Sequence, residues 1–404
     1  MNKLTDRKQI QKITYLFMIT YMVSYITRIN FGAIVSEMVN DTGISKSMLS
    51  LSLTGSFVTY GVGQIISGIC GDKFRPKKLV FYGLLASIVM NLLIPFCSSP
   101  KSMLVIWSIN GFAQAFMWPP IVKLISELLN EEDYKKACVI ISRGSACGTI
   151  SIYLLGPALI ALSSWRLVFI FSAVCGIIML VLWNALCIDV QNEAPKADSN
   201  TKKSGGINTQ GLFTPLMFGV MFAIVLQGIL RDGVTTWMPS YISETYHLGS
   251  EISILTGIVM PIFSIFSFQI AADLYKKKFT NPLMCSAVMF GVGAAVALAL
   301  YYLSGSAAIV SVLFSALLTG CMHGINLILI TMLPAFFSRY GNVSTASGVL
   351  NACTYIGSAI STYGIAVIAE NKGWSFTIFI WFIIAFLGFG ACMLCVKPWK
   401  KEYM

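Results

Sequence analysis

Two arginines lie deep within apolar stretches of the sequence. Arg28 falls in the apolar run from Tyr15 to Met38, and Arg231 falls in the run from Gly211 to Tyr241. A charge at the depth of a lipid bilayer is costly unless it faces a polar cavity or a partner, so such residues are candidates for function. A guanidinium stays protonated and presents a planar fork of donors that binds phosphate or carboxylate through two hydrogen bonds. The pair predicts a buried anion site; the alternative is that each arginine is neutralised within its own bundle, for example by Asp232, and serves packing.

The composition excludes an ordinary soluble protein. The chain of 404 residues is 56% hydrophobic and 11% charged, with a mean hydropathy of +0.76, whereas soluble domains carry about 25% charged residues. Apolar runs of roughly 20 residues, long enough to cross a bilayer, begin near positions 11, 47, 78, 101, 135, 165, 211, 250, 281, 306, 342 and 373. We therefore expect an all-α integral membrane protein with twelve transmembrane helices.

The basic residues indicate how these helices are oriented. Twenty lysines and arginines fall in alternate connections, which include both ends of the chain, and only four fall in the intervening connections. Cytoplasmic connections carry the excess of Lys and Arg in membrane proteins. We therefore expect a multi-pass protein of the cytoplasmic (inner) membrane with both termini in the cytoplasm. The net charge of +11 is then a consequence of topology, and no nucleic-acid partner is expected.

A polar segment divides the chain into two halves. Residues 189–210 are rich in Lys, Ser, Asn and Gly and lack apolar periodicity, which is typical of a flexible linker. We expect an N-terminal six-helix bundle in residues 1–188, a cytoplasmic linker in 189–210 and a C-terminal six-helix bundle in 211–404. Similar segments recur about 200 residues apart in the same order, which predicts two pseudo-symmetric bundles. The matched pairs are Arg28 with Arg231, residues 71–75 with 272–276, and residues 137–148 with 346–357.

Four motifs carry a resemblance to a known family. They are YITRINF at Tyr25 to Phe31, WPP followed by a lysine at Trp118 to Lys123, RDGVTTWMPSY at Arg231 to Tyr241, and the loop motif GDKFRPK at Gly71 to Lys77. On these motifs the chain resembles the major facilitator superfamily and, within it, the organophosphate:phosphate antiporter family. The resemblance implies alternating access, with the two arginines binding the phosphoryl group of one substrate from opposite halves.

The sequence departs from that family at two positions. The family places a lysine on its second helix and a histidine on its fifth, where this chain has Gln64 and Gly144. Both departures remove a potential phosphate partner, so an anionic substrate is expected while the role of inorganic phosphate as exchange partner stays open. The adjacent Arg143 either returns the lost charge or extends to the cytoplasmic interface.

Further polar and aromatic residues are candidates for the substrate site. Asn351, Tyr355 and Ser358 share one face of an expected helix, and aromatic rings offer apolar surface together with OH or NH donors, although packing explains any single ring as well. Lys123 either assists the anion or pairs with Glu127, four residues on. The residues expected to bind substrate are Arg28, Arg231, Tyr25, Gln64, Trp118, Lys123, Arg143, Asp232, Trp237, Asn351 and Tyr355.

Ionisable side chains bear on how transport is coupled. Asp232 is the only deep carboxylate, and the adjacent Arg231 would keep it ionised, so anion exchange fits better than proton symport. For His323, a role in packing or beside a gate is at least as good an explanation as the binding and release of a proton during transport. The loop motif lies at the cytoplasmic edge, and the resemblance implies that it latches the two halves in one state. The residues expected to take part in gating are Asp72, Arg75, Lys77 and Asp273.

The leading interpretation is a secondary active transporter of small organic anions, with an organophosphate such as a sugar phosphate or glycerol phosphate carried by anion exchange. Two alternatives stay open: a proton- or sodium-coupled symporter of carboxylates such as sugar acids, and a transporter-like membrane sensor of organophosphates. An enzyme is not expected, because no nucleophile with a base and no metal-ligand cluster occurs at motif spacing. We expect no metal and no cofactor, and a monomer whose partners are the substrate and the lipid bilayer.

Overall fold

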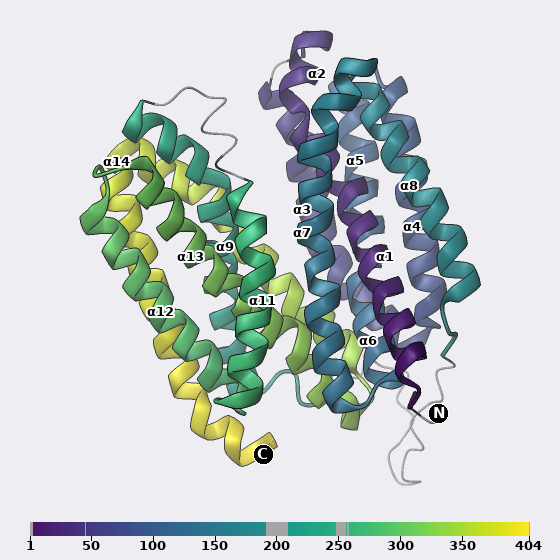
Figure 1. The fold of residues 1–404 in the computed structure, drawn as a ribbon, viewed down its shortest axis with the longest axis vertical. Coiled ribbons are helices and arrows are strands. Elements are labelled where there is room, and N and C mark those ends of the chain that lie inside the picture. Colours follow the sequence, from purple (N-terminus) through teal and green to yellow (C-terminus); the bar gives the residue numbers. More distant parts are fainter. Residues whose placement is uncertain (1–2, 45, 191–208, 248–255, 257, 404) are drawn as a thin grey trace. The chain divides into compact units, whose positions relative to one another are not determined.

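The computed structural model describes residues 3–44, 46–190, 209–247, 256 and 258–403, and these residues form helices and connections without any strand. The helices of the first half are α1 (Arg7–Ala33), α2 (Val35–Thr42), α3 (Lys46–Lys73), α4 (Pro76–Leu93), η1 (Ile94–Phe96), α5 (Pro100–Gln114), α6 (Trp118–Leu128), α7 (Glu131–Leu162) and α8 (Trp165–Leu186) (Figure 1). Those of the second half are α9 (Pro215–Tyr246), α11 (Val259–Lys277), α12 (Pro282–Leu303), α13 (Ala308–Asn326), η2 (Leu327–Met332), η3 (Leu333–Tyr340) and α14 (Val343–Tyr403).

Where the structure describes them, the apolar runs of the sequence fall on these helices. Eight of the described helical segments are long and apolar enough to cross a bilayer by themselves. The other expected spans lie on α1, on α5 with α6, on α11 and on the first part of α14. The run that begins near position 250 starts among residues outside the described part of the chain and continues in α11. The expected all-α membrane architecture is therefore confirmed.

The helices begin where local sequence favours a start. Asn130 caps α7 by accepting a hydrogen bond from the backbone N of Asp133 at 2.8 Å, and Asn281 caps α12 by accepting from the backbone N of Leu283 at 2.9 Å. Such side chains satisfy N–H groups that lack a partner within the helix. Proline occupies the first turn of α4, α5, α9 and α12, where its missing N–H has no cost.

The chain divides into two compact units. Unit 1 comprises residues 1–210 together with 334–352, and unit 2 comprises residues 211–333 together with 353–404. The helix α14 therefore begins in unit 1 and continues in unit 2. Gly373, at φ 79°, breaks the helical backbone of α14, which separates the two apolar runs that this long element contains.

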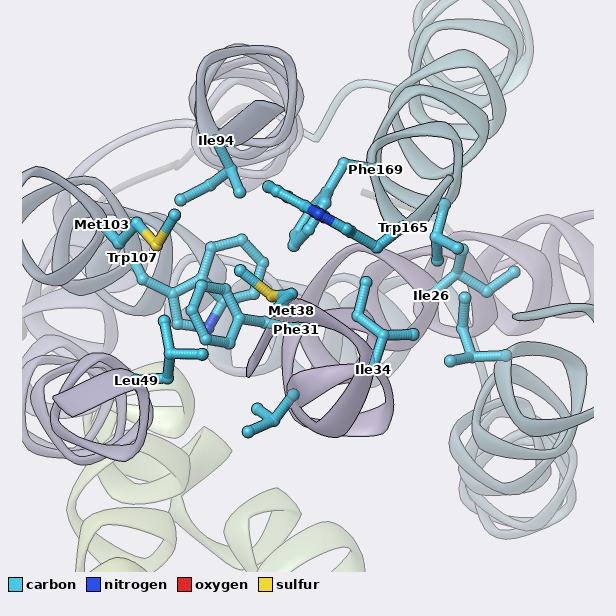
Figure 2. Close-up of a cluster of buried hydrophobic side chains, with 13 residues drawn as sticks. Ile26, Phe31, Ile34, Met38, Leu49, Ile94, Met103, Trp107, Trp165 and Phe169 are labelled. Atoms are coloured by element: carbon cyan, nitrogen blue, oxygen red, sulfur yellow. The ribbon is translucent and has the colours of Figure 1, made fainter. Parts of the chain in front are cut away.

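Unit 1 contains a cluster of buried hydrophobic side chains at the end that carries α2 (Figures 1 and 2). Phe31 of α1 lies beside Trp107 of α5, with ring centroids 5.0 Å apart, and Phe169 of α8 contacts both rings edge to face. Aromatic pairs in these arrangements add to the free energy gained from burial. The cluster fixes α1, α5 and α8 to one another. It thereby fixes the rotation of α1 and the direction in which the face with Arg28 points.

A polar contact closes the same end of unit 1. The Asp41 carboxylate accepts hydrogen bonds from Nε1 of Trp165 at 2.8 Å and from Nη1 of Arg166 at 2.9 Å. These two donors hold the pKa of Asp41 below the usual range for an aspartate. A carboxyl whose pKa is lower in the folded than in the unfolded protein stabilises the fold above the unfolded pKa and loses that effect as the pH falls through the folded pKa.

We expect Asp41→Asn to lower the melting temperature at neutral pH by a few degrees. The deficit should hold from about pH 7 to about pH 5 and shrink as the pH falls below about 4, because the wild-type carboxyl, whose folded pKa lies below the usual range, then begins to be protonated as well. Differential scanning fluorimetry in detergent across this range measures the effect. Glu132→Gln, which removes one carboxylate from an exposed pair with Lys136, is the control and should show no such convergence. If the deficit of Asp41→Asn did not change with pH, the ionisation of Asp41 would make no contribution to the stability of the fold.

Candidate functional site

Arg28 lies on an aromatic face of α1 within unit 1. Its guanidinium carbon is 4.1 Å from the centroid of the Tyr25 ring and 4.7 Å from that of the Tyr60 ring of α3. Cations are attracted to the faces of aromatic rings, the more so where water is excluded. Tyr21, one turn before Tyr25, packs against Trp118 of α6 with ring centroids 4.6 Å apart. The structure thus brings three of the expected site residues, Arg28, Tyr25 and Trp118, to one aromatic face.

The opposite side of α1 is held by a buried network of amide side chains. Asn91 of α4 and Asn110 of α5 both donate from Nδ2 to the carbonyl oxygen of Thr27, at 3.0 and 3.1 Å. Gln114 donates from Nε2 to Oγ1 of Thr27 at 2.7 Å, and Asn30 donates to Oδ1 of Asn91 at 2.7 Å. All of these side chains are almost completely buried. The network fixes the rotation of α1 at the residue that precedes Arg28.

Sequence reasoning missed this network, although a signal was present. Three amide side chains, Asn91, Asn110 and Gln114, interrupt two otherwise apolar runs. Buried amides require partners, so they indicated polar contacts between helices. Their common target on α1 could not be read from spacing alone, because it depends on how the helices pack.

We expect Asn110→Ala to lower the free energy of unfolding by about 2 kcal/mol, because the carbonyl of Thr27 and the hydroxyl of Ser87 each lose a buried hydrogen-bond partner. Thermal melts of the purified protein measure the loss. The control is Asn184→Ala, since the Asn184 side chain is exposed and its loss should leave the melting temperature unchanged. Equal melting temperatures for both variants would contradict the assigned role of the network.

Arg231 of α9 is paired with its neighbour within unit 2. Its Nε lies 2.6 Å from Oδ1 of Asp232 and its Nη2 lies 2.8 Å from Oδ2. The exposed fractions of the two side chains are 15% and 31%. Oδ2 of Asp232 also accepts a hydrogen bond from Oγ of Ser358 in α14. The structure thus brings Arg231 and Asp232 together in a bidentate ion pair that a third polar residue extends.

His323 of α13 completes the polar cluster in unit 2. Its Nδ1 is 2.9 Å from the carbonyl oxygen of Thr319, one turn earlier, and its ring packs edge to face against Phe268 of α11. The ring is close enough to Arg231 and Asp232 to interact electrostatically with both. The histidine is therefore held by the Thr319 carbonyl and by the Phe268 ring, in the electrostatic neighbourhood of the ion pair.

Two residues expected to bind substrate are instead bonded to each other within unit 1. Nδ2 of Asn351 donates to Oε1 of Gln64 at 2.9 Å, and Nε2 of Gln64 donates to the carbonyl oxygen of Ala115 at 3.3 Å. The backbones of α3 and α14 approach closely beside this contact, since a Cβ added at Gly348 would lie 2.3 Å from the carbonyl oxygen of Gln64. In this structure the pair joins α14 to α3 and α5.

Asp72, at the end of α3, caps the beginning of α14. Its Oδ1 accepts from the backbone N of Ser344 at 3.0 Å and its Oδ2 accepts from that of Thr345 at 2.7 Å. A carboxylate at the start of a helix satisfies N–H groups without partners and interacts favourably with the helix dipole. Nζ of Lys123 lies 3.6 Å from both Asp72 and Glu127 and donates to the Asp72 carbonyl oxygen at 3.3 Å. Lys123, considered above as an anion partner, is engaged by this cluster.

The other residues expected to take part in gating have separate contacts. Arg75 pairs with Asp189 at 3.1 Å. Lys77 donates from Nζ to the carbonyl oxygens of Asn184 and Cys187, at 3.0 and 2.7 Å, and so ties the start of α4 to the end of α8. Asp273 of α11 accepts from Gln269 at 3.3 Å and pairs with Lys277 at 3.9 Å. Of the four residues, Asp72 is the one whose described hydrogen bonds reach α14.

The departure from the family at position 144 has a steric consequence. A Cβ added at Gly144 of α7 would lie 2.4 Å from the carbonyl oxygen of Met18, and one at Gly148 would lie 2.4 Å from that of Met22. The two glycines let α7 approach the backbone of α1 closely, as paired small residues do in membrane helices. A histidine at position 144 would require α1 to move. The neighbouring Arg143 is partly buried in α7.

The remaining expected site residues lie in unit 2. Trp237 is partly exposed on α9, and its Nε1 is buried without a hydrogen-bond partner among the described residues. Tyr355 is partly exposed on α14, one turn before the position of Ser358. Tyr241, at the end of the same α9 motif, is buried and bonded to Ser304 and Ser311 at 2.8 Å each, which is a packing role.

Comparisons with known proteins agree with this architecture. A probable hexose phosphate transport protein of Chlamydia trachomatis serovar D is 21% identical, with 90% of this chain and 86% of the relative covered. The glycerol-3-phosphate transporter of Bacillus subtilis strain 168 is 24% identical over 88% and 85% of the two chains, and the membrane sensor protein UhpC of Escherichia coli K12 is 21% identical over 94% and 89%. Among solved structures, the proton:xylose symporter XylE matches with a TM-score of 0.77 at 13% identity over 99% of this chain and 97% of that one.

The family assignment rests on most of the chain. Residues 17–362 match the Major Facilitator Superfamily, a range that includes Arg28, Arg231 and the Asp72 loop. The relatives include proteins named as hexose phosphate and glycerol-3-phosphate transporters, so the resemblance to the organophosphate:phosphate antiporter family is confirmed. The protein is a multi-pass membrane protein that belongs to the Major Facilitator Superfamily.

Proposed function

We propose that this protein is a secondary active transporter that carries a small organophosphate across the membrane by exchange for another anion. The observation that carries the proposal is the pair of repeat-related arginines, Arg28 in unit 1 and Arg231 in unit 2, each partly buried on the first long helix of its half. Relatives named as hexose phosphate and glycerol-3-phosphate transporters support the same substrate class. A transporter, and not an enzyme, is the function that follows.

The arginines supply the anion selectivity in this proposal. A phosphoryl group with two negative charges suits two guanidinium groups that each donate two hydrogen bonds, whereas a neutral sugar does not. The partly exposed ring of Tyr25 supplies apolar surface for the organic part of the substrate, and the buried rings of Tyr60 and Trp118 support this face from behind. A bound anion would also neutralise charge in the pathway and so lower the cost of the alternating-access step.

The orientation and assembly state are part of the proposal. The distribution of Lys and Arg supports a cytoplasmic location for both termini, for residues 189–210 and for the Asp72 loop. The two halves, residues 1–188 and 211–404, act as the moving bundles, and the protein works as a monomer in the cytoplasmic membrane. Its partners are the substrate and the lipid bilayer.

Transport in proteoliposomes tests the proposal. Vesicles loaded with glycerol 3-phosphate or inorganic phosphate should take up labelled glycerol 3-phosphate or glucose 6-phosphate, and empty vesicles should not. Uptake should be unchanged by an imposed proton or sodium gradient. Uptake that ignores the internal anion and follows a cation gradient would overturn exchange in favour of symport, with sugar acids then the substrates to test.

A sensor is the second candidate function. The relative named membrane sensor protein UhpC matches over as much of the chain as the named transporters do. A sensor would bind the organophosphate without moving it across the bilayer. Specific binding by the purified protein, together with no counterflow in any loaded vesicle, would favour this function over transport.

A further inference from the structure

In the ion pair of unit 2, the Asp232 carboxylate binds the Arg231 guanidinium in the way that an anionic substrate would bind it. Asp232 engages Nε and Nη2 of Arg231 through both carboxylate oxygens, at 2.6 and 2.8 Å. This is the side of the guanidinium fork that planar anions bind bidentately. The residue next to Arg231 therefore occupies donors that a phosphate or carboxylate ligand would use.

In the absence of substrate, Asp232 compensates the charge of Arg231. A guanidinium at bilayer depth is costly unless an anion or a polar cavity compensates it. Asp232 lies on the same helix at the adjacent position, so the compensation needs no movement of another element. The two side chains are 15% and 31% exposed, so the ion pair is not fully enclosed.

Asp232 has a second partner that does not depend on Arg231. Oγ of Ser358 donates to Oδ2 of Asp232 and comes from α14, a different helix of unit 2. A carboxylate that leaves Arg231 can keep this donor, and because a hydrogen bond to an unpaired carboxylate is stronger than one to a carboxylate already paired with a cation, Ser358 lowers the cost of separating the pair.

We propose that Asp232 is a resident counterion that competes with the substrate for Arg231. The anion binds by taking the Nε and Nη2 donors while Ser358 retains the displaced carboxylate, and Asp232 returns to Arg231 when the anion leaves. The inference rests on the proposed function, because it takes Arg231 as a substrate ligand. It makes Asp232 a determinant of substrate charge: a ligand must outcompete a carboxylate, which favours phosphate dianions over carboxylate monoanions.

Two substitutions with opposite expected effects test the competition. Asp232→Asn removes the competing charge, so the Kd for glycerol 3-phosphate should fall at least tenfold while the counterflow rate falls, because the anion is released more slowly. Ser358→Ala removes the partner of the displaced carboxylate, so the Kd should rise several-fold. The double variant should bind like Asp232→Asn alone, because Ser358 acts through the carboxylate. Equilibrium binding of glycerol 3-phosphate and inorganic phosphate to the purified full-length protein supplies the Kd values.

A matched control isolates the position of the charge. Glu244→Gln makes the same change from carboxylate to amide on α9, at an exposed residue that accepts a hydrogen bond from Trp374, and should leave both Kd values unchanged. A purely structural role for Asp232 predicts weaker or unaltered binding after Asp232→Asn, and that result would overturn the inference. If Asp232→Asn does not fold, an unchanged or lower Kd in Ser358→Ala overturns it instead.

The outcomes separate this inference from the proposed function. If the wild type binds glycerol 3-phosphate in a manner that depends on Arg231, but Asp232→Asn binds no more tightly, the counterion role fails and the transporter assignment stands. If neither the wild type nor Asp232→Asn binds either phosphate, both fail. Tighter binding in Asp232→Asn, with Ser358→Ala shifted the other way, supports both.

Discussion

Replacing Arg28 or Arg231 with alanine should weaken the binding of glycerol 3-phosphate and glucose 6-phosphate by at least about 100-fold, which corresponds to roughly 3 kcal/mol. In the proposed function each substitution removes two charge-assisted hydrogen bonds to the anion, which are about twice as strong as hydrogen bonds between neutral groups. Lysine at either position should restore only a small part of the affinity, because a point charge lacks that fork. Equilibrium binding to the purified protein measures the effect, and counterflow should fall in parallel.

The control for the arginine variants lies at the far end of unit 1 from the Asp72 loop. Arg166 pairs with Asp41 at 2.9 Å, so Arg166→Ala removes a more exposed, ion-paired arginine that lies outside the proposed pathway. It should lower thermal stability and leave the affinity for both phosphates within twofold of the wild type. Wild-type affinity in Arg28→Ala or in Arg231→Ala, with the protein folded, would defeat the assignment of that arginine to the substrate.

Arg231→Ala carries a complication that Arg28→Ala does not. Loss of Arg231 leaves Asp232 without its ion-pair partner, and an uncompensated charge in a partly buried position destabilises a protein. The double variant Arg231→Ala with Asp232→Asn removes both charges and should recover the melting temperature without recovering binding. Stability and affinity are then separated, and the binding loss is assigned to the arginine itself.

Local sequence predicted the features that depend on one helix. Apolar runs of bilayer length gave the helices because a chain in lipid must satisfy its backbone hydrogen bonds internally. The adjacency of Arg231 and Asp232 offered their pairing as the alternative to a substrate anion site, but adjacent residues of a helix point about 100° apart, so sequence alone did not show that the two side chains meet. The positions of Arg28 and Arg231 in matching helices were also readable, because the repeat preserves order and spacing.

Contacts between helices were less predictable, for a physical reason. The pairing of Gln64 with Asn351 and the capping of α14 by Asp72 join residues more than 270 positions apart. Which faces of two helices meet is decided by close packing, here by the absence of a side chain at Gly68 and Gly348. Polar residues in apolar runs revealed that partners were needed and left the identity of those partners open.

The contact between Asp72 and α14 yields the second large expected effect. Asp72→Asn removes the charge that caps two backbone N–H groups and leaves Lys123 without one of its two carboxylate partners. The loss of a charged cap weakens such a contact by about 1–2 kcal/mol, and a two-state equilibrium then shifts by about 5- to 30-fold. We expect the start of α14 to separate from α3 more often and the transport rate to fall about tenfold, while the Kd of substrate changes less than twofold, because Asp72 lies 12 residues along α3 from Tyr60, the α3 residue that contacts Arg28.

The accessibility of Ser347 reports on this separation directly. Its side chain is fully buried in the present structure, so a cysteine introduced by Ser347→Cys in a cysteine-free background should react slowly with a polar maleimide. Adding Asp72→Asn should raise the reaction rate at least about fivefold, the lower limit of the population shift. Asp189→Asn is the matched control: it removes the partner of Arg75 in the neighbouring connection and leaves the hydrogen bonds from Asp72 to α14 intact, so the rate should stay at that of Ser347→Cys alone. Equal rates in Asp72→Asn and Asp189→Asn would mean that the cap does not hold α14 against α3, and the fall in transport would then need another cause.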